Sequence, residues 1–336
     1  MGQMAHLRNY VLLDGCEVVA ISEPRSGLRE QVAARYGIKQ SFPDAESMIA
    51  TVELDGLVAS QPFDRHGSIV KPLYRHQLPI FTEKPIASSV EVGEQMVGAL
   101  SSVHMVGYHK RSDLATVYAK SEIERLKATG ELGQMRYVRI TMPPGDWVAS
   151  GFNELIRSDE PSPQIPPDPP APDMEATVFA EYVTFVNYYV HQVNLLRHLL
   201  GEPYRVEYVD PSQVLLAAKS ESGVCATIEM RPYETTVDWQ ESALVCFEKG
   251  WISLSLPAPL AHNRAGRVRV FRDPGRGEPP STFEPQLPWE HAMMSQARNF
   301  LKAIVGEADA PCGALEAVED LRVARDVVLF HTKLLI

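Results

Sequence analysis

The first third of the chain alternates short apolar stretches with amphipathic ones. Four apolar stretches have the length of buried strands: residues 16–23, 55–60, 78–81 and 104–108. The stretches between them predict helices: residues 25–36, 45–52, 68–76 and 91–100. Strands and helices in this alternation are typical of a doubly wound parallel sheet.

The pattern changes near Arg111. A long helix is predicted at residues 114–130, and residues 136–140 begin to alternate like a half-buried strand. The proline-dense stretch 161–172 predicts an extended loop. An apolar helix is predicted at residues 180–200, closed by Gly201 and Pro203.

The remaining pattern predicts a second domain with its own sheet. Four segments recur at hairpin spacing and indicate an antiparallel sheet: residues 213–216, 224–230, 242–247 and 251–256. Two helices, 291–306 and 315–333, follow. We therefore predict a Rossmann-type domain at residues 1–111 and an α/β domain with an open, mainly antiparallel sheet at 112–336. The last helices are free to pack back on the first domain.

The first residues look like half of a motif. Residues 1–7 resemble the second part of a glycine-rich turn between a strand and a helix, and a helix is predicted at 4–13. No strand precedes this turn, although the first strand of such a sheet lies at its centre. We expect a true start upstream of Met1; a damaged Rossmann domain is the alternative.

Composition narrows the class of protein. The length of 336 residues corresponds to about two domains. A net charge of −11 argues against nucleic acid or an anionic membrane as partner. The four cysteines lie far apart without metal-ligand spacing, which is typical of reduced cytosolic thiols. With no apolar run long enough to span a bilayer and no signal peptide, we expect a soluble cytoplasmic protein without a metal.

The sequence Glu83-Lys84-Pro85 follows the apolar stretch 78–81. Pro85 cannot donate to a strand ladder, so it ends the strand there. In an open α/β sheet, ligands bind beyond the carboxyl ends of the strands. A desolvated Lys84, steered by Glu83, would serve proton transfer there. The alternative is a surface salt bridge at a strand end.

Glu23 ends what would be the second strand of a dinucleotide-binding fold. An acid at this position accepts the ribose hydroxyls of NAD and repels the 2′-phosphate of NADP. Arg25 would instead tolerate the phosphate, and a helix-capping acid is the plain alternative. Of the glycine motif, Gly2 is present, Ala5 stands in the third glycine's place, and the first glycine is absent.

The predicted helix 180–200 carries a polar stripe. Asn187, His191, Asn194 and His198 are spaced by four, three and four residues and would share one face. A neutral imidazole at His191 suits removal of a proton from a substrate alcohol. The alternative is a core histidine with satisfied hydrogen bonds.

Together these residues resemble the Gfo/Idh/MocA family of glucose–fructose oxidoreductases and inositol dehydrogenases. The similarity spans nearly the whole chain, and Glu83-Lys84-Pro85 is its most specific part. The other matching residues are Glu23-Pro24, Ser60-Gln61-Pro62 with His66, Gly107-Tyr108 with Arg111, His191 ahead of Leu195-Leu196, Gly201-Glu202-Pro203, and Gln296, Phe300 and Ile304. The resemblance implies hydride transfer between a nicotinamide and a hydroxyl carbon of a sugar, cyclitol or polyol. It also implies a homo-oligomer, a dimer or tetramer.

The resemblance also implies roles for individual residues. Lys84 would contact the substrate hydroxyl and the nicotinamide ribose, and His191 would be the catalytic histidine, oriented by Asn187 in place of the family's usual aspartate. Asn194 likewise replaces a common acid. The cofactor contacts would be Gly2, Gln3, Met4, Glu23, Arg25, Ser60, Gln61, Pro62, His66, Glu83 and Lys84. The substrate contacts would be Lys84, Tyr108, Asp146, Trp147, Asn187 and His191, with Trp147 a sugar-stacking surface or part of a packed linker.

The sequence thus predicts an NAD-dependent oxidoreductase acting on a sugar-like alcohol or ketone, with NADP as the alternative cofactor. A second hypothesis is an enzyme that cleaves or epimerises glycosides and retains its NAD through the cycle. A third is a sensor or scaffold of the same fold with impaired turnover, which Asn187 and the absent strand favour.

Overall fold

The computed structural model describes residues 1–275 and 277–334. They form two compact units. The first unit consists of Met1–Gly107, Ser150–Pro170 and Gln296–Glu316. The second consists of Tyr108–Ala149, Ala171–Ser295 and Ala317–Ile336. Two segments from the predicted second domain, 150–170 and 296–316, therefore belong to the first unit.

The first unit is a parallel α/β structure, as predicted. Strands β3 (Leu57–Ala59), β4 (Ile80–Glu83) and β5 (His104–Gly107) form one parallel sheet, and β1 (Ala20–Ser22) pairs in parallel with β2 (Gln40–Phe42). In the described residues these are two separate sheets.

The helices of this unit end where local signals place them. They are α2 (Ser26–Tyr36), α3 (Ala45–Thr51), α4 (His66–Ile69) and α5 (Val90–Gly98). Asp44 and Ser89 accept the backbone N–H of Ser47 and Val92 as N-caps, and Gly37 ends α2 in the left-handed conformation (φ 68°).

Two predicted helices of the first unit were partly wrong. Residues 68–76 form α4 and then a 3₁₀ helix, Lys71–His76, because Pro72 has no N–H with which to continue the α-helical ladder. The helix predicted at 4–13 is a π-helix, Gly2–Leu7, followed by one turn, α1 (Arg8–Tyr10).

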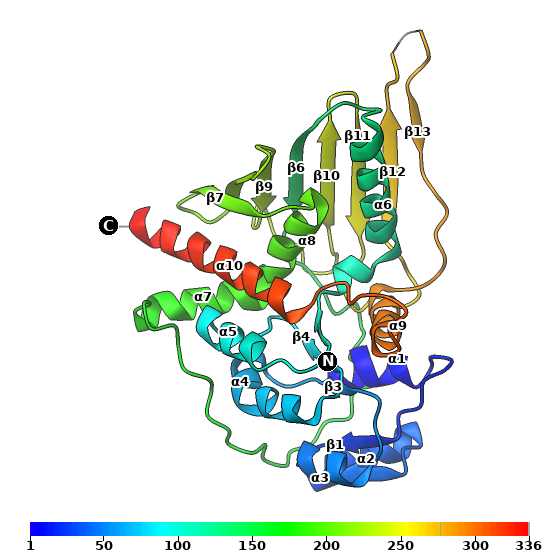
Figure 1. Cartoon of the computed structure of the whole chain (residues 1–336), viewed down its shortest axis with the longest axis vertical. Coiled ribbons are helices and arrows are strands. Elements are labelled where there is room, and N and C mark those ends of the chain that lie inside the picture. The colour runs from blue at the N-terminus through cyan, green and yellow to red at the C-terminus, as the bar shows by residue number, and fades with distance from the viewer. Residues whose placement is uncertain (276, 335–336) are drawn as a thin grey trace. The chain divides into compact units, whose positions relative to one another are not determined.

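The second unit contains an open sheet of eight strands in the order β13-β12-β11-β10-β6-β9-β8-β7 (Figure 1). The strands are β6 (Met135–Thr141), β7 (Tyr204–Val209), β8 (Leu215–Ser220), β9 (Cys225–Glu229), β10 (Glu241–Phe247), β11 (Gly250–Leu256), β12 (Arg267–Arg272) and β13 (Ser281–Phe283). All neighbours are antiparallel except β6 and β9, which are parallel. The predicted mainly antiparallel open sheet is confirmed, although β12 and β13 extend beyond the predicted strands.

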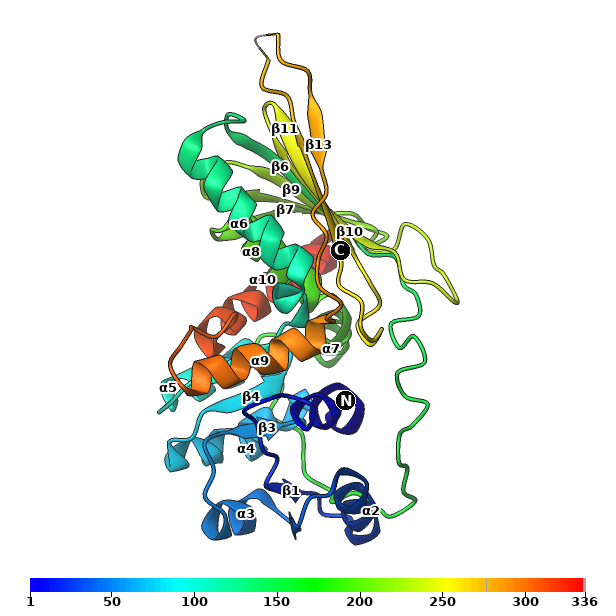
Figure 2. The same ribbon diagram turned by 90° about the vertical axis from the view of Figure 1, so that its right-hand side faces the viewer.

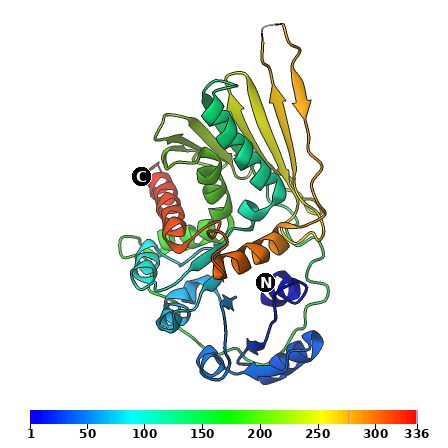
Figure 3. The same cartoon turned by 45° about the vertical axis from the view of Figure 1, so that its right-hand side comes forward.

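Helices cover one face of this sheet. Residues on β10 alternate between buried and half-buried, so each strand presents one side to a core. Helix α6 (Leu114–Thr129) packs on β11 and β12, and α8 (Val190–Leu200) packs on β6 and β9. Figure 2 shows both helices on the same side of the sheet, and Figure 3 shows α6 lying along the strands. The other face carries half-exposed side chains.

The single helix predicted at 180–200 is wrong. The structure has α7 (Ala176–Tyr188) and α8, which run in different directions (Figure 1). The break lies at Tyr189 (φ −93°, ψ −5°), whose hydroxyl donates a hydrogen bond to the carbonyl oxygen of Met230 beside the sheet. This long-range contact anchors the bend, whereas the apolar pattern continues through it.

Two long helices complete the chain, α9 (Ala292–Ile304) and α10 (Ala314–Leu334). Both were predicted at nearly these bounds. None of the helices in the described residues combines the length and apolar character that a membrane span requires.

Candidate active site

Lys84 directly follows β4 at the carboxyl end of the three-stranded parallel sheet. Pro85 follows it through a cis peptide bond. Glu83 pairs in register with Gly107 of β5. A Cβ atom at residue 107 would lie 2.9 Å from the ring of Phe81 and 3.0 Å from the carbonyl oxygen of Thr82. Glycine therefore allows the close strand contact that fixes the backbone before Lys84.

The carboxylate of Glu83 has a partner that the sequence did not reveal. Its Oε1 lies 2.7 Å from Nε2 of the buried His6, and its Oε2 accepts the backbone N–H of Lys84 at 3.3 Å. Burial opposes ionisation of Glu83, but the hydrogen bond and charge of His6 and the charge of Lys84 hold its pKa below the ordinary value. An ionised Glu83 thus orders the peptide that carries Lys84.

Glu23 and Arg25 form a bidentate pair immediately after β1. The guanidinium donates Nε–H to Oε1 at 2.6 Å and Nη2–H to Oε2 at 3.0 Å. Both side chains keep about a quarter of their surface exposed. The hydrogen bonds that Arg25 donates to Glu23 raise the pKa of Arg25. Glu23, the acid predicted to bind the ribose hydroxyls, therefore lies at the strand end, and its carboxylate already forms an ion pair with Arg25.

The three cofactor contacts predicted in the first residues, Gly2, Gln3 and Met4, lie in different surroundings. Gly2 lies against Ser60, because a Cβ at residue 2 would stand 3.4 Å from the Cβ of Ser60. Met4 is a core residue with 2% exposure. The amide of Gln3 donates to the carbonyl oxygen of Ile156 at 3.0 Å and accepts the N–H of Ile156 at 3.1 Å. The segment 150–170 therefore lies against this predicted cofactor contact.

His66 is fully buried between two loops. Its Nδ1 lies 2.9 Å from the carbonyl oxygen of Ile86, and its Nε2 lies 3.3 Å from that of Gln61. Burial lowers its pKa despite these contacts. The ring thus ties the loop after β3, where Pro62 begins a 3₁₀ turn, to the loop after β4. The predicted cofactor contact His66 is therefore a buried link between two loops.

In the second unit, His191 is held by two consecutive rings. The ring of Tyr108 meets it edge-on at 5.8 Å between centroids, and the ring of His109 at 4.7 Å. His191 lies in the first turn of α8, and Tyr108 and His109 follow β5. The sequence analysis named Tyr108 but missed His109, although the basic run His109-Lys110-Arg111 after a buried strand was a usable signal.

Lys110 lies in a buried network beside these rings. Its ammonium forms an ion pair with Glu241 and lies 5.5 Å from the ring centroid of Trp239. Glu241 also accepts hydrogen bonds from Gln192 at 2.7 Å and from the Trp239 indole at 3.2 Å. The carboxylate is therefore multiply bonded, which buried charges require.

The polar stripe predicted around His191 divides between two helices. Asn187 lies exposed on α7, so the predicted common helix face with His191 is wrong. Asn194 is buried, accepts Nε–H of Arg111 at 2.6 Å and donates to Asp320 at 2.7 Å. It therefore joins three elements of the second unit.

Asp146 shapes the loop after β6. Its Oδ1 accepts the N–H groups of Val148 at 3.0 Å and Ala149 at 3.1 Å, and the carbonyl of Trp147 accepts the N–H of Leu260 at 3.3 Å. Both predicted substrate contacts are half-buried in the second unit.

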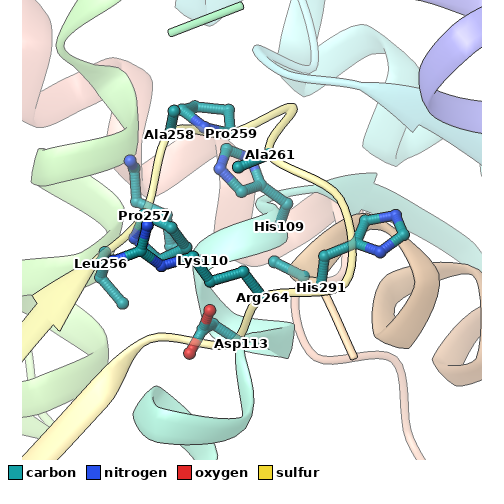
Figure 4. Close-up of a pocket in the computed structure, with 11 residues that line it drawn as sticks. His109, Lys110, Asp113, Leu256, Pro257, Ala258, Pro259, Ala261, Arg264 and His291 are labelled. Atoms are coloured by element: carbon teal, nitrogen blue, oxygen red, sulfur yellow. The ribbon is translucent and has the colours of Figure 1, made fainter. Parts of the chain in front are cut away.

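A pocket in the second unit lies next to His109 (Figure 4). The loop between β11 and β12 forms one wall, and the start of α9 forms another. Its ionisable lining residues are His109, Lys110, Asp113, Arg264 and His291. The Asp113 carboxylate accepts backbone N–H groups of Ala115 and Gly266. His109 is thus shared between the pocket and the contact with His191.

Comparison with known proteins finds a family that resembles the first part of the chain. Residues 1–108 match the Gfo/Idh/MocA model, described as an oxidoreductase family with an NAD-binding Rossmann fold. Over these residues the chain therefore resembles the Gfo/Idh/MocA oxidoreductase family. It is 24% identical to the scyllo-inositol 2-dehydrogenase (NAD⁺) of Bacillus subtilis over 242 residues, which is 67% of this chain. The match spans about 62% of the length of that curated relative.

Solved structures of the same fold cover almost the whole chain. An oxidoreductase from Agrobacterium radiobacter, solved with NAD⁺, L-tartaric acid and magnesium, has a TM-score of 0.69 at 14% identity over 98% of this chain and 93% of that one. A levoglucosan dehydrogenase solved with NADH and levoglucosan has a TM-score of 0.71 at 17% identity over 98% and 93%. At this identity the likeness establishes the fold of both units.

Proposed function

We propose that the protein is an NAD-dependent oxidoreductase that interconverts a secondary alcohol and a ketone on a sugar, cyclitol or related polyol. The observation that carries the proposal is Lys84 at the carboxyl end of a parallel strand, in a unit whose residues 1–108 match an NAD-binding family. Ligands of open parallel sheets bind beyond this edge.

The residues of the first unit fit a dinucleotide. Directly after β1, the carboxylate of Glu23 can accept hydrogen bonds from ribose hydroxyls. A Cβ at residue 2 would be in van der Waals contact with Ser60, so Gly2 keeps the space beside Ser60 open. Lys84 and the loop at Gln61 and Pro62 follow the neighbouring strands. NAD, when bound there, supplies the hydride acceptor.

The chain's own residues would handle orientation and the proton. The Lys84 ammonium would donate a hydrogen bond to the reacting oxygen and stabilise the negative charge that develops on it. The imidazole of His191 would accept the hydroxyl proton. The rings of Tyr108 and His109 would restrict the rotation of that imidazole. Ring packing thereby takes over the orienting role that the sequence assigned to Asn187.

A screen of polyols, cyclitols and glycosides with NAD tests the proposal through the absorbance of the reduced nicotinamide. Reduction of free NAD by one of these compounds supports it. Cofactor that remains bound without exchange during turnover would instead favour a glycoside-cleaving or epimerising enzyme. Absence of nucleotide binding would favour a sensor or scaffold.

The open face of the large sheet supports a homo-oligomer, a dimer or tetramer, as part of this proposal. Tyr137, Cys246, Trp251 and Phe271 lie in register across four strands on the face opposite α6 and α8, and all are half-buried. Light scattering of the full chain measures the assembly. Trp251→Glu should lower its mass, because a charge would be buried in an apolar contact.

A further inference from the structure

The segment 154–168 of the first unit, here termed the strap, has no regular secondary structure but is tied down along its length (Figure 2). Ile156 exchanges two hydrogen bonds with the Gln3 amide. The carbonyl of Ile165 accepts Nε–H of Arg65 at 2.7 Å, and the N–H of Asp168 donates to the carbonyl of Asp64 at 2.6 Å. The strap therefore has a defined path beside the helical segments Gly2–Leu7 and Phe63–Arg65 of the first unit.

Glu160 of the strap binds the N-terminus of α2. Its Oε1 accepts the N–H of Leu28 at 3.0 Å, and its Oε2 accepts the N–H of Gly27 at 3.2 Å and the hydroxyl of Ser26 at 3.3 Å. Ser158 donates a further hydrogen bond at 3.0 Å. A Cβ at residue 27 would stand 2.7 Å from Oε1, so glycine permits this approach.

The position of the Glu160 carboxylate relative to Glu23 indicates what it would do when a dinucleotide binds. Glu23 directly follows β1 and α2 begins three residues later, so both acids lie at the turn where the adenosine ribose of a dinucleotide would bind. A 2′-phosphate at such a turn is received by an arginine and by N–H groups at the helix start. Here Arg25 is bound by Glu23, and the N–H groups are bound by Glu160.

We propose that Glu160 is a cofactor-specificity residue, whose carboxylate fills the phosphate-receiving position of α2 and excludes NADP while admitting NAD. The inference rests on the proposed NAD-dependent function. Two physical effects support it. Glu160 would occupy the N–H donors that a 2′-phosphate needs, and its carboxylate would add a second negative charge beside that of Glu23. The charge of Glu160 also acts on Arg25, which would otherwise attract the phosphate.

A second acid of the strap, Asp168, provides a control for substitutions at Glu160. Asp168 makes the same kind of contact with α4, where its carboxylate accepts the N–H of Gly67 at 2.7 Å and of Ser68 at 3.0 Å. A Cβ at residue 67 would likewise stand 2.9 Å from this carboxylate. Asp168→Asn therefore loosens the strap at a helix other than the one that follows Glu23.

The experiment measures the dissociation constants of NAD and NADP by calorimetry on the full chain with the substitutions Glu160→Gln, Glu160→Ala and Asp168→Asn. Both Glu160 variants should bind NADP at least about tenfold more tightly, while NAD affinity stays within about twofold. Asp168→Asn should leave the ratio of the two constants unchanged. The gain for NADP should shrink at high salt, because it is electrostatic.

Three outcomes would overturn the inference. If NAD binds and the Glu160 variants keep the original ratio, Glu160 has no role in specificity and the proposed function stands. If NAD and NADP tighten equally, the strap merely competes with any nucleotide. If no variant binds either nucleotide, the proposed function fails together with the inference.

Discussion

The carboxyl edge of the first unit and the surroundings of His191 in the second unit are built by different means. At the edge, Glu23 pairs with Arg25 and Glu83 accepts the N–H of Lys84, both close in sequence, and only His6, 77 residues from Glu83, is a remote partner among these contacts. Around His191 the partners are remote. Lys110 and Glu241 are 131 residues apart, and Asn194 and Asp320 are 126 apart.

The difference separates two kinds of site. The strand end places Lys84 by backbone geometry, so Lys84 should be exchangeable without unfolding the unit. A buried network is part of the core, so the same side chains support both the site and stability. Substitutions should therefore have separable effects at the edge and combined effects near His191.

The largest effect is expected for Lys84→Ala. Loss of a positioned proton-transfer group should lower kcat by about two to four orders of magnitude. Because Lys84 lies at a strand end, the urea unfolding midpoint should stay close to that of the unmodified protein. Near-full activity in the purified variant would remove Lys84 from the proposed mechanism.

Substitutions that break one ion pair in each region compare how much the two pairs contribute to the free energy of unfolding. Lys110→Met leaves Glu241 charged and buried and should lower the free energy of unfolding by about 3–5 kcal/mol. Arg25→Met breaks a partly exposed pair and should cost less than about 1 kcal/mol. Urea unfolding measures both.

The double variant Lys110→Met with Glu241→Leu serves as a control, because it removes both charges and should recover most of the lost stability. Equal losses in the single variants Lys110→Met and Arg25→Met would contradict the contrast between a buried and a partly exposed pair.

One histidine in each unit, the buried His104 and the half-buried His198, should make stability depend on pH. Burial lowers the pKa of His104 to about 3, and burial with nearby positive charges lowers that of His198 to about 2. Below the unfolded value near about 6.5 the unfolded state binds more protons, so stability falls as pH falls. Each group contributes up to about 1.4 kcal/mol per pH unit of slope.

Urea unfolding between neutral pH and pH 5 checks this slope. His104→Gln removes the titrating ring between Tyr74 and Thr82, and His198→Gln removes the ring on α8, so each should flatten the curve. An unchanged slope in both variants would show that neither ring is kept neutral by the fold.

The smallest expected effects on catalysis are those of substitutions at His109 and Asn187. His109→Ala removes the ring packed against His191 and should lower kcat about tenfold, with less change in KM. Asn187→Asp adds an exposed carboxylate on α7, whose charge is screened by water. Its pH–rate profile should keep its acid limb. A clear upward shift of that limb would restore the orienting role that the sequence assigned to Asn187.

Much of the fold follows from the sequence because its signals are local. Apolar stretches ending at Glu23 and Glu83 define parallel strands whose carboxyl ends carry the acid and the lysine. Glycine ends helices at Gly37, Gly130 and Gly201, each in the left-handed conformation. These features depend on a few adjacent residues, so the pattern of one segment is sufficient.

Tertiary structure decided the features that join distant segments. The pattern of residues 180–200 is helical throughout, and the bend comes from the Tyr189 contact with Met230. His6 meets Glu83 across 77 residues, and Glu160 reaches Gly27 across 133, without a periodic signal at either end. Hydrogen bonds of this kind depend on where folding brings two backbones together, which hydrophobic periodicity does not encode.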